Sequence, residues 1–234
     1  MPDSLRAPLP LTLENLRFHA GGRVILDIPA LDVPAGGFVV LRGASGAGKS
    51  TALALIAGIT PASAGRVLWG DLDLAAMPAA ARRRFRRERL GLVFQDYRLF
   101  PELDALTNAS LAAGWAAPAR RGAIRASAAA ALSALGLGAA QTRRSAVMSG
   151  GERQRTAVAR ALATDPVALL ADEPTASLDR ANADRLAADL GALAGARTLI
   201  VVSHDPAIHE VALQAIGGRV VTLADGRIAE DSGA

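Results

Sequence analysis

A glycine-rich segment, Gly43 to Ser50 with the sequence GASGAGKS, has the residue types and spacing that bind phosphate. Glycines let the backbone curl so that successive N–H groups point at phosphate oxygens, and a helix that follows adds the positive end of its dipole. Lys49 would neutralise the β- and γ-phosphates of a nucleotide, and Ser50 would offer its hydroxyl to Mg²⁺. The expected nucleotide-binding residues of this segment are Gly43, Ala44, Ser45, Gly46, Ala47, Gly48, Lys49, Ser50 and Thr51.

Lys49 is the only lysine in the sequence, and every other basic residue is an arginine. A general bias toward arginine and alanine explains the other positions. A lysine at this one place has a chemical reason, because a compact ammonium on a flexible stem folds over phosphate oxygens where a planar guanidinium fits badly. The residue type therefore favours phosphate binding over the alternative, a glycine-rich turn that happens to end in Lys-Ser.

An acidic pair, Asp172 and Glu173, follows the apolar run 168–171. P-loop proteins need a carboxylate near the metal, normally at the end of a buried strand. We expect Asp172 to hold Mg²⁺ through its water shell and Glu173 to polarise the water that attacks the γ-phosphate. Taken alone, an Asp-Glu-Pro sequence is as easily the start of a loop. Kinases and switch GTPases combine the same two elements, so other residues must decide between these classes.

A turn of small residues, Ser149-Gly150-Gly151-Glu152, opens a predicted helix upstream of the acidic pair. Its free N–H groups and its serine hydroxyl would form a second phosphate-binding surface, and a simple helix cap is the alternative. With Met148 the segment reads MSGGE, which resembles the LSGGQ signature of ABC ATPases. The resemblance covers nearly the whole chain. It implies that two copies of the chain close head-to-tail around two ATP molecules, each signature completing the site of the partner.

Further positions match motifs of the same family. Gln95 resembles the Q-loop glutamine, which contacts the metal and the attacking water and responds to the membrane partner. Asp179 ends a Ser-Leu-Asp sequence that resembles the D-loop, which communicates across the dimer, and His204 resembles the switch histidine that touches the γ-phosphate. With ATP and Mg²⁺ as ligands, the resemblance implies catalytic roles for Glu173, His204 and Gln95, metal contacts from Ser50, Gln95 and Asp172, and nucleotide contacts from Ser149, Gly150, Gly151, Glu152 and Asp179.

The signature departs from the family pattern at both ends. Met148 replaces leucine and should change only packing. Glu152 replaces glutamine and brings a carboxylate near the nucleotide of the partner. If Ser149 and Gly151 bind that nucleotide, the Glu152 side chain should point along the helix and away from the phosphates. We expect the substitution to be tolerated.

The N-terminal segment is predicted to be an antiparallel hairpin, with strands 11–18 and 23–28 separated by two glycines. In ABC ATPases an aromatic residue before the glycine usually stacks on adenine, but this chain has Ala20 there. Phe18 and His19 are the alternatives for base stacking.

The rest of the chain alternates between patterns typical of strands and of helices, which predicts a parallel sheet with covering helices. Strands are expected at 38–42, 66–69, 91–94, 167–171 and 198–202, with a closing hairpin at 219–223 and 227–229; helices are expected at 50–57, 78–89, 104–135 with breaks near Gly114 and Pro118, 151–163 and 180–193. We therefore expect an α/β P-loop NTPase core with a mostly parallel sheet, an N-terminal antiparallel β subdomain and a helical subdomain insert at about 96–165, all in one domain, 1–234.

Composition excludes several other kinds of site. The chain has no cysteine and three histidines, so disulfides and thiolate metal sites are excluded and other metal centres are not expected. No stretch has the roughly 18 consecutive apolar residues of a membrane-spanning helix, and the first ten residues lack the pattern of a signal peptide. We expect a cytoplasmic protein, with other chains supplying any pore.

Six arginines lie within residues 82–89, RRRFRRER. They are too dense for one helical face, and a solvated helix in an arginine-rich chain explains them. The alternative is a basic surface that meets anionic lipid headgroups or the coupling helix of a transmembrane partner.

Residues 83–101 resemble the lipoprotein-releasing, macrolide-efflux and cell-division branch of ABC ATPases. The resemblance implies a motor at the inner face of the cell membrane, bound to permease subunits, for export or lipoprotein release.

A non-transport ABC ATPase acting on nucleic acid or ribosomes is the main alternative. Such chains usually carry coiled coils, zinc modules or a second cassette, and a net charge of +4 does not argue for nucleic acid. A P-loop kinase would leave Ser149–Glu152, Gln95 and His204 unexplained. The ATPase does not touch the transported substrate, so these residues do not identify it.

Overall fold

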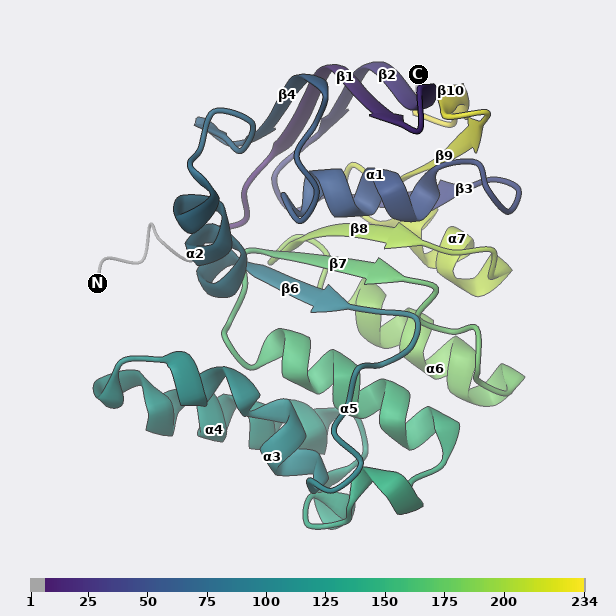
Figure 1. Ribbon diagram of the computed structural model, residues 1–234. Helices are drawn as coiled ribbons and strands as arrows, with labels where there is room; N and C mark the ends of the chain where they lie inside the picture. The colour runs from purple at the N-terminus through teal and green to yellow at the C-terminus, as the bar shows by residue number, and fades with distance from the viewer. Residues whose placement is uncertain (1–6, 234) are drawn as a thin grey trace.

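The structure of the chain, a computed structural model, describes residues 7–233. From top to bottom in Figure 1 it has an antiparallel sheet, the helix α1 (Lys49–Ile56), a mostly parallel sheet, and a group of helices. The expected α/β architecture is confirmed. None of the helices in residues 7–233 is long and apolar enough to cross a membrane.

The antiparallel sheet has the strand order β2-β1-β4-β5. Its strands are β1 (Leu11–Ala20), β2 (Arg23–Val33), β4 (Ala64–Trp69) and β5 (Leu72–Asp73). The predicted N-terminal hairpin is present, and Gly21 and Gly22 both have positive φ in its turn. Both hairpin strands run further than predicted, because apolar residues as far as Val33 reach the core.

The larger sheet has the order β10-β9-β3-β8-β7-β6. Its strands are β3 (Phe38–Arg42), β6 (Leu90–Val93), β7 (Ala168–Asp172), β8 (Thr198–Val202), β9 (Arg219–Ala224) and β10 (Arg227–Asp231). All neighbours except the β9–β10 hairpin are parallel. Parallel strands end at the same edge of a sheet, so the segments that follow β3, β6, β7 and β8 meet at one edge.

Two apolar cores cover the two faces of this sheet. Successive strand residues point to opposite faces. In β3, Val39 and Leu41 pack with α1 and the antiparallel sheet, while Phe38 and Val40 pack with the helices on the other face. All four are at most 1 % exposed. This two-sided burial explains why the strands after the hairpin are continuously apolar in sequence.

The remaining helices are α2 (Ala79–Arg89), α3 (Ala105–Ala109), α4 (Pro118–Ala134), α5 (Gly150–Leu162), α6 (Arg180–Gly191) and α7 (Pro206–Gln214), with short 3₁₀ turns at 111–115, 138–140 and 145–147. The predicted helical region 104–135 is interrupted where expected, and Pro118 begins α4. Helix α7 was not predicted, although Asp205 caps it and Pro206 is its first residue. Both residues are ordinary signals of a helix start. A helix of nine residues is too short to show a long apolar periodicity, and this is why it was not predicted.

A buried asparagine ties together the helices below the sheet. Asn108 in α3 is fully buried. Its Oδ1 accepts a bond from the Phe100 N–H at 2.8 Å, and its Nδ2 lies 3.0 Å from the Phe100 oxygen and 3.1 Å from the Leu103 oxygen. The Ser145 hydroxyl also donates to the Phe100 oxygen, at 2.7 Å. One side chain therefore satisfies the backbone of a loop that has no regular structure.

We expect Asn108→Ala to lower the free energy of unfolding by about 2 kcal/mol, because it leaves the Phe100 N–H without a partner and removes a fully buried amide from its site. Ser110→Ala on the same helix is a matched control. Its hydroxyl donates only to the Leu106 oxygen, which already accepts the Ser110 N–H, and its loss should cost under about 1 kcal/mol. Urea unfolding measures both, and equal losses would contradict the assignment.

Candidate functional site

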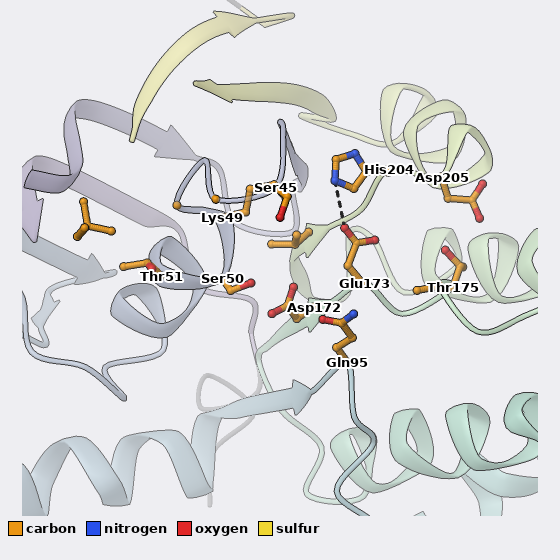
Figure 2. A pocket seen from close by; sticks show the side chains of 15 residues that line it. Ser45, Lys49, Ser50, Thr51, Gln95, Asp172, Glu173, Thr175, His204 and Asp205 are labelled. Atoms are coloured by element: carbon orange, nitrogen blue, oxygen red, sulfur yellow. Dashed lines mark ion pairs between the residues drawn. The ribbon is translucent and has the colours of Figure 1, made fainter. Parts of the chain in front are cut away.

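A cavity of about 690 Å³ opens at the carboxyl edge of the parallel strands, within the size range of small-molecule sites. The ends of β3, β6, β7 and β8 all contribute to it (Figure 2). Its lining includes most of the predicted catalytic, metal-binding and P-loop residues: Ser45, Gly46, Gly48, Lys49, Ser50, Thr51, Gln95, Asp172, Glu173 and His204.

The P-loop glycines have the backbone that the sequence predicts. Gly43, Gly46 and Gly48 have φ of 145°, 80° and 93°, a region that other residues rarely adopt. At Gly43 a Cβ would also overlap the carbonyl oxygen of Leu223 in β9. This close approach fixes the loop against the neighbouring strand, so its N–H groups face the cavity without a side chain between them.

The Lys49 side chain folds back over the loop. Lys49 is the first residue of α1 and only 9 % exposed. Its Nζ donates to the Gly43 oxygen at 2.6 Å and to the Ala44 oxygen at 2.9 Å. These contacts use two of its three N–H donors and hold the ammonium at the cavity wall. A single positive charge therefore lies where the loop N–H groups converge.

Three oxygen donors for a metal lie along one wall of the cavity. Ser50 comes from α1, Asp172 from the end of β7, and Gln95 from the residue pair after β6. Within residues 7–233 the Asp172 carboxylate makes no hydrogen bond and no ion pair, although it is partly buried. A hydroxyl, an amide oxygen and an uncommitted carboxylate are hard ligands of the kind that Mg²⁺ prefers, so the residues fit the predicted ion.

Glu173 and His204 face each other across the top of the cavity (Figure 2). His204 Nε2 lies 3.5 Å from Glu173 Oε1, and the two residues follow neighbouring strands. Glu173 has φ of 48°, and its N–H donates to the Val202 oxygen at 2.9 Å. This left-handed backbone is uncommon for a side-chain residue, and the bond to β8 compensates for its cost. The arrangement places the Glu173 carboxylate and the His204 imidazole side by side, so both groups can act on a proton of the same bound molecule.

The signature Ser149–Glu152 lies outside this cavity, at the start of α5. Ser149 and Glu152 form a capping box, in which the Ser149 Oγ accepts the Glu152 N–H at 3.2 Å and the Glu152 Oε2 accepts the Ser149 N–H at 2.8 Å. Arg143 pairs with Glu152 at 2.7 Å. The bond from the Ser149 N–H, reinforced by Arg143, lowers the pKa of Glu152. The carboxylate is thus turned back onto its own helix start.

Asp179 caps α6 beside the signature. Its Oδ1 accepts the Asn182 N–H at 2.9 Å, and this bond lowers its pKa. The Asn182 Oδ1 in turn accepts from Arg155 of α5 at 2.8 Å. A Cβ on Gly150 would lie 3.3 Å from the Ser177 oxygen. The predicted D-loop and signature therefore form one surface, separate from the cavity that holds Lys49.

The residues considered for base stacking do not line the cavity. Ala20 and His19 are exposed at the end of β1, and Phe18 packs against the core between the sheets. Ile25 of β2 lines the cavity instead, and it was not predicted because its segment was interpreted only as a strand of the N-terminal hairpin. Thr175 and Asp205 also line the cavity without having been predicted, and Asp205 belongs to the helix start that the sequence analysis missed.

Comparison with known proteins gives consistent matches. A family model described as ABC transporter matches residues 26–176. The chain is 40 % identical over 98 % of its length to an Fe(3+) ions import ATP-binding protein of Streptomyces coelicolor, and it spans 62 % of that protein. It is also 40 % identical over 89 % of its length to a lipoprotein-releasing system ATP-binding protein of Chromohalobacter salexigens, and it spans 86 % of that relative. A solved dimer of the ATP-binding cassette MJ0796, described as a post-hydrolysis state with ADP and Pi, has a TM-score of 0.81 and 30 % identity over 95 % of this chain and 97 % of that one.

We expect Glu152→Ala to lower the free energy of unfolding by about 1 kcal/mol, because it removes half of the capping box. Glu152→Gln is the matched control, since an amide oxygen can still accept the Ser149 N–H. Because the pKa of Glu152 is lowered in the folded state, its stabilisation is present above the ordinary glutamate pKa and disappears as the pH falls through the lowered value. Urea unfolding should show the alanine effect at pH 7 and little of it in acid; equal effects at both would contradict this account.

Proposed function

The chain belongs to the ABC transporter family, and from this premise we propose that it is the ATP-binding and ATP-hydrolysing subunit of a transporter or mechanotransmission complex. The observation that carries the proposal is the single cavity in which the P-loop, Gln95, the acidic pair and His204 meet at adjacent strand ends. These are the parts that phosphoryl transfer to water requires: a phosphate cradle, a metal site and a water-orienting base.

Each group in the cavity has a distinct role in the proposed hydrolysis. Lys49 and the loop N–H groups bind the phosphates and offset their charge. Ser50, Asp172 and Gln95 hold Mg²⁺, which supplies charge neutralisation on the phosphate oxygens when bound. Glu173 accepts a proton from the attacking water, and His204, within 3.5 Å, orients that carboxylate.

The separate signature surface supports a head-to-tail dimer. Gly150 and Gly151 lie in the first turn of α5, where backbone N–H groups and the positive end of the helix dipole can bind an anion, and Asp179 lies beside them at the start of α6. None of these residues lines the chain's own cavity, so we propose that a second copy supplies the phosphates that they meet. The dimer of the related cassette with ADP and Pi supports the same arrangement.

We expect Glu173→Gln to leave ATP binding intact and to reduce hydrolysis at least about 100-fold, because the proton acceptor is lost while the phosphate cradle is not. The variant should then form an ATP-dependent dimer on gel filtration. Adding Ser149→Phe, which blocks the helix start, should abolish that dimer. If ATP and Mg²⁺ produce no tighter dimer of the Glu173→Gln protein, the head-to-tail mechanism is wrong.

We propose that the membrane partner docks in a groove lined by α2, β6 and the 3₁₀ turn 111–115. In the α2 run, Arg82 and Arg86 donate to backbone oxygens, and Arg84 pairs with Glu88, which Arg87 approaches only to 3.8 Å. Arg83 and Arg87 line the groove beside Trp115, which is 70 % exposed. Apolar area flanked by guanidinium groups fits an amphipathic segment with acidic residues. We therefore place permease subunits here, with this chain peripheral on the cytoplasmic face of the membrane.

We further propose the export or lipoprotein-release type, on the basis of residues 83–101. One relative is named for iron import and another for lipoprotein release, so the names of relatives do not decide the direction. A neighbouring gene for a membrane protein with four spans and a large extracytoplasmic domain would support the release type, and a neighbouring importer permease would refute it.

We expect Arg83→Glu with Arg87→Glu to reduce co-purification with the membrane protein encoded beside this chain about tenfold or more, because the partner's acidic residues would be repelled. Arg125→Glu with Arg185→Glu makes the same charge change on exposed faces of α4 and α6 and should have no such effect. Equal losses from both pairs would indicate a general electrostatic attraction and not this groove.

A further inference from the structure

The loop that follows Gln95 has an unfavourable backbone. Tyr97 and Arg98 have φ of 58° and 48°, so two consecutive side-chain residues are left-handed. Each such residue costs free energy because its Cβ crowds the carbonyl oxygen. The Tyr97 hydroxyl is also buried, and it has no hydrogen-bond partner in residues 7–233. Such a turn persists only when its surroundings hold it.

Arg160, near the end of α5, bonds to the backbone of this turn and adds to the bonds that the turn makes within itself. Its Nη1 donates to the Arg98 oxygen at 2.5 Å and its Nη2 to the Tyr97 oxygen at 2.6 Å. The planar guanidinium therefore binds both left-handed residues through their backbone. No ion pair of Arg160 with a carboxylate occurs within the described chain. Burial, with the nearby Arg98, lowers the pKa of this guanidinium.

The same helix carries the signature at its other end. α5 runs from Gly150 to Leu162 without a break, and Ser149 caps its start. Its 13 residues form one hydrogen-bonded segment about 20 Å long, so Arg160 and Ser149 lie on the same rigid element. The contact at Arg160 therefore links the loop of Gln95 to the surface that meets the partner's nucleotide.

We propose that Arg160 is a positioning residue for ATP hydrolysis, which fixes the Gln95 loop to the helix that carries Ser149–Gly151. The inference rests on the proposed function. Arg160 does not line the nucleotide cavity and acts through Gln95. It therefore governs the rate of the chemical step and leaves the contacts of Lys49 with the phosphates unchanged.

This role predicts a specific kinetic pattern. Arg160→Gln should lower kcat about tenfold or more, since a small displacement of a positioning group is costly in rate, while KM for ATP changes less than about twofold. Arg160→Lys should fall in between, because one ammonium replaces the planar pair of donors. Arg125→Gln on the exposed face of α4 is the matched control and should behave as the parent chain.

A second-site change separates positioning from general stability. Glycine tolerates positive φ, so Arg98→Gly lowers the cost of the turn and keeps the backbone oxygen, while it removes the exposed ion pair with Asp96 and the contact with the Phe94 ring. Combined with Arg160→Gln it should restore kcat about threefold or more. If Arg160→Gln or Arg160→Lys keeps the parent kcat, if KM rises in place of the fall in kcat, or if Arg98→Gly restores nothing, the proposal is overturned.

Hydrogen exchange supplies a readout that does not depend on hydrolysis. In the full-length chain without nucleotide, Arg160→Gln should speed amide exchange in residues 95–99 about tenfold or more, and Arg125→Gln should not. If the parent chain does not hydrolyse ATP, the proposed function fails while this exchange test still decides the contact. Unchanged exchange in residues 95–99 would overturn the positioning role by itself.

Discussion

The parallel register of four strands is the constraint on which the site depends. β3 pairs with β8 so that Leu41 lies opposite Val202, and β7 pairs with β8 so that Asp172 lies opposite the same residue. The P-loop, the acidic pair and His204 therefore begin at the same height along the sheet. Helices and loops of very different length connect these strands, and none of them changes where the strands end. The positions of the proposed catalytic groups are set by backbone hydrogen bonds and by the burial of two apolar faces.

The sequence predicts this part of the molecule well because its signals are local. GASGAGKS after an apolar run indicates a strand, a loop and a helix, and the structure has each of them with positive φ at the three glycines. The acidic pair and Gln95 likewise stand directly after apolar segments. Residues at the ends of strands in one parallel sheet lie at the same edge. The order of strands and motifs in the sequence was therefore sufficient to predict that these residues lie close together.

Other features depend on contacts that no short pattern records. Ile25 lines the cavity because the hairpin folds over the P-loop. Phe18 does not line it, because the same hairpin packs the Phe18 side chain against the core. The pairing of Glu152 with Arg143 requires two segments to meet at the start of α5. The two carbonyls bound by Arg160 belong to residues about sixty positions earlier, which an arginine-rich composition could not single out.

Backbone strain in the site has a common physical basis. Glu173 and the Tyr97–Arg98 pair are left-handed although none of them is glycine. Glycine would adopt these angles at lower cost, but Glu173 must carry a carboxylate, so the chain retains the side chain and compensates for the backbone elsewhere. At Glu173 the compensation is a bond to β8, a rigid strand. At Tyr97 and Arg98 it comes from the side chain of a helix. A strand bond cannot change without disrupting the sheet, whereas a side-chain contact can break and re-form. The proposed catalytic carboxylate is therefore fixed to the sheet, whereas the loop of Gln95 is held by a contact that can change.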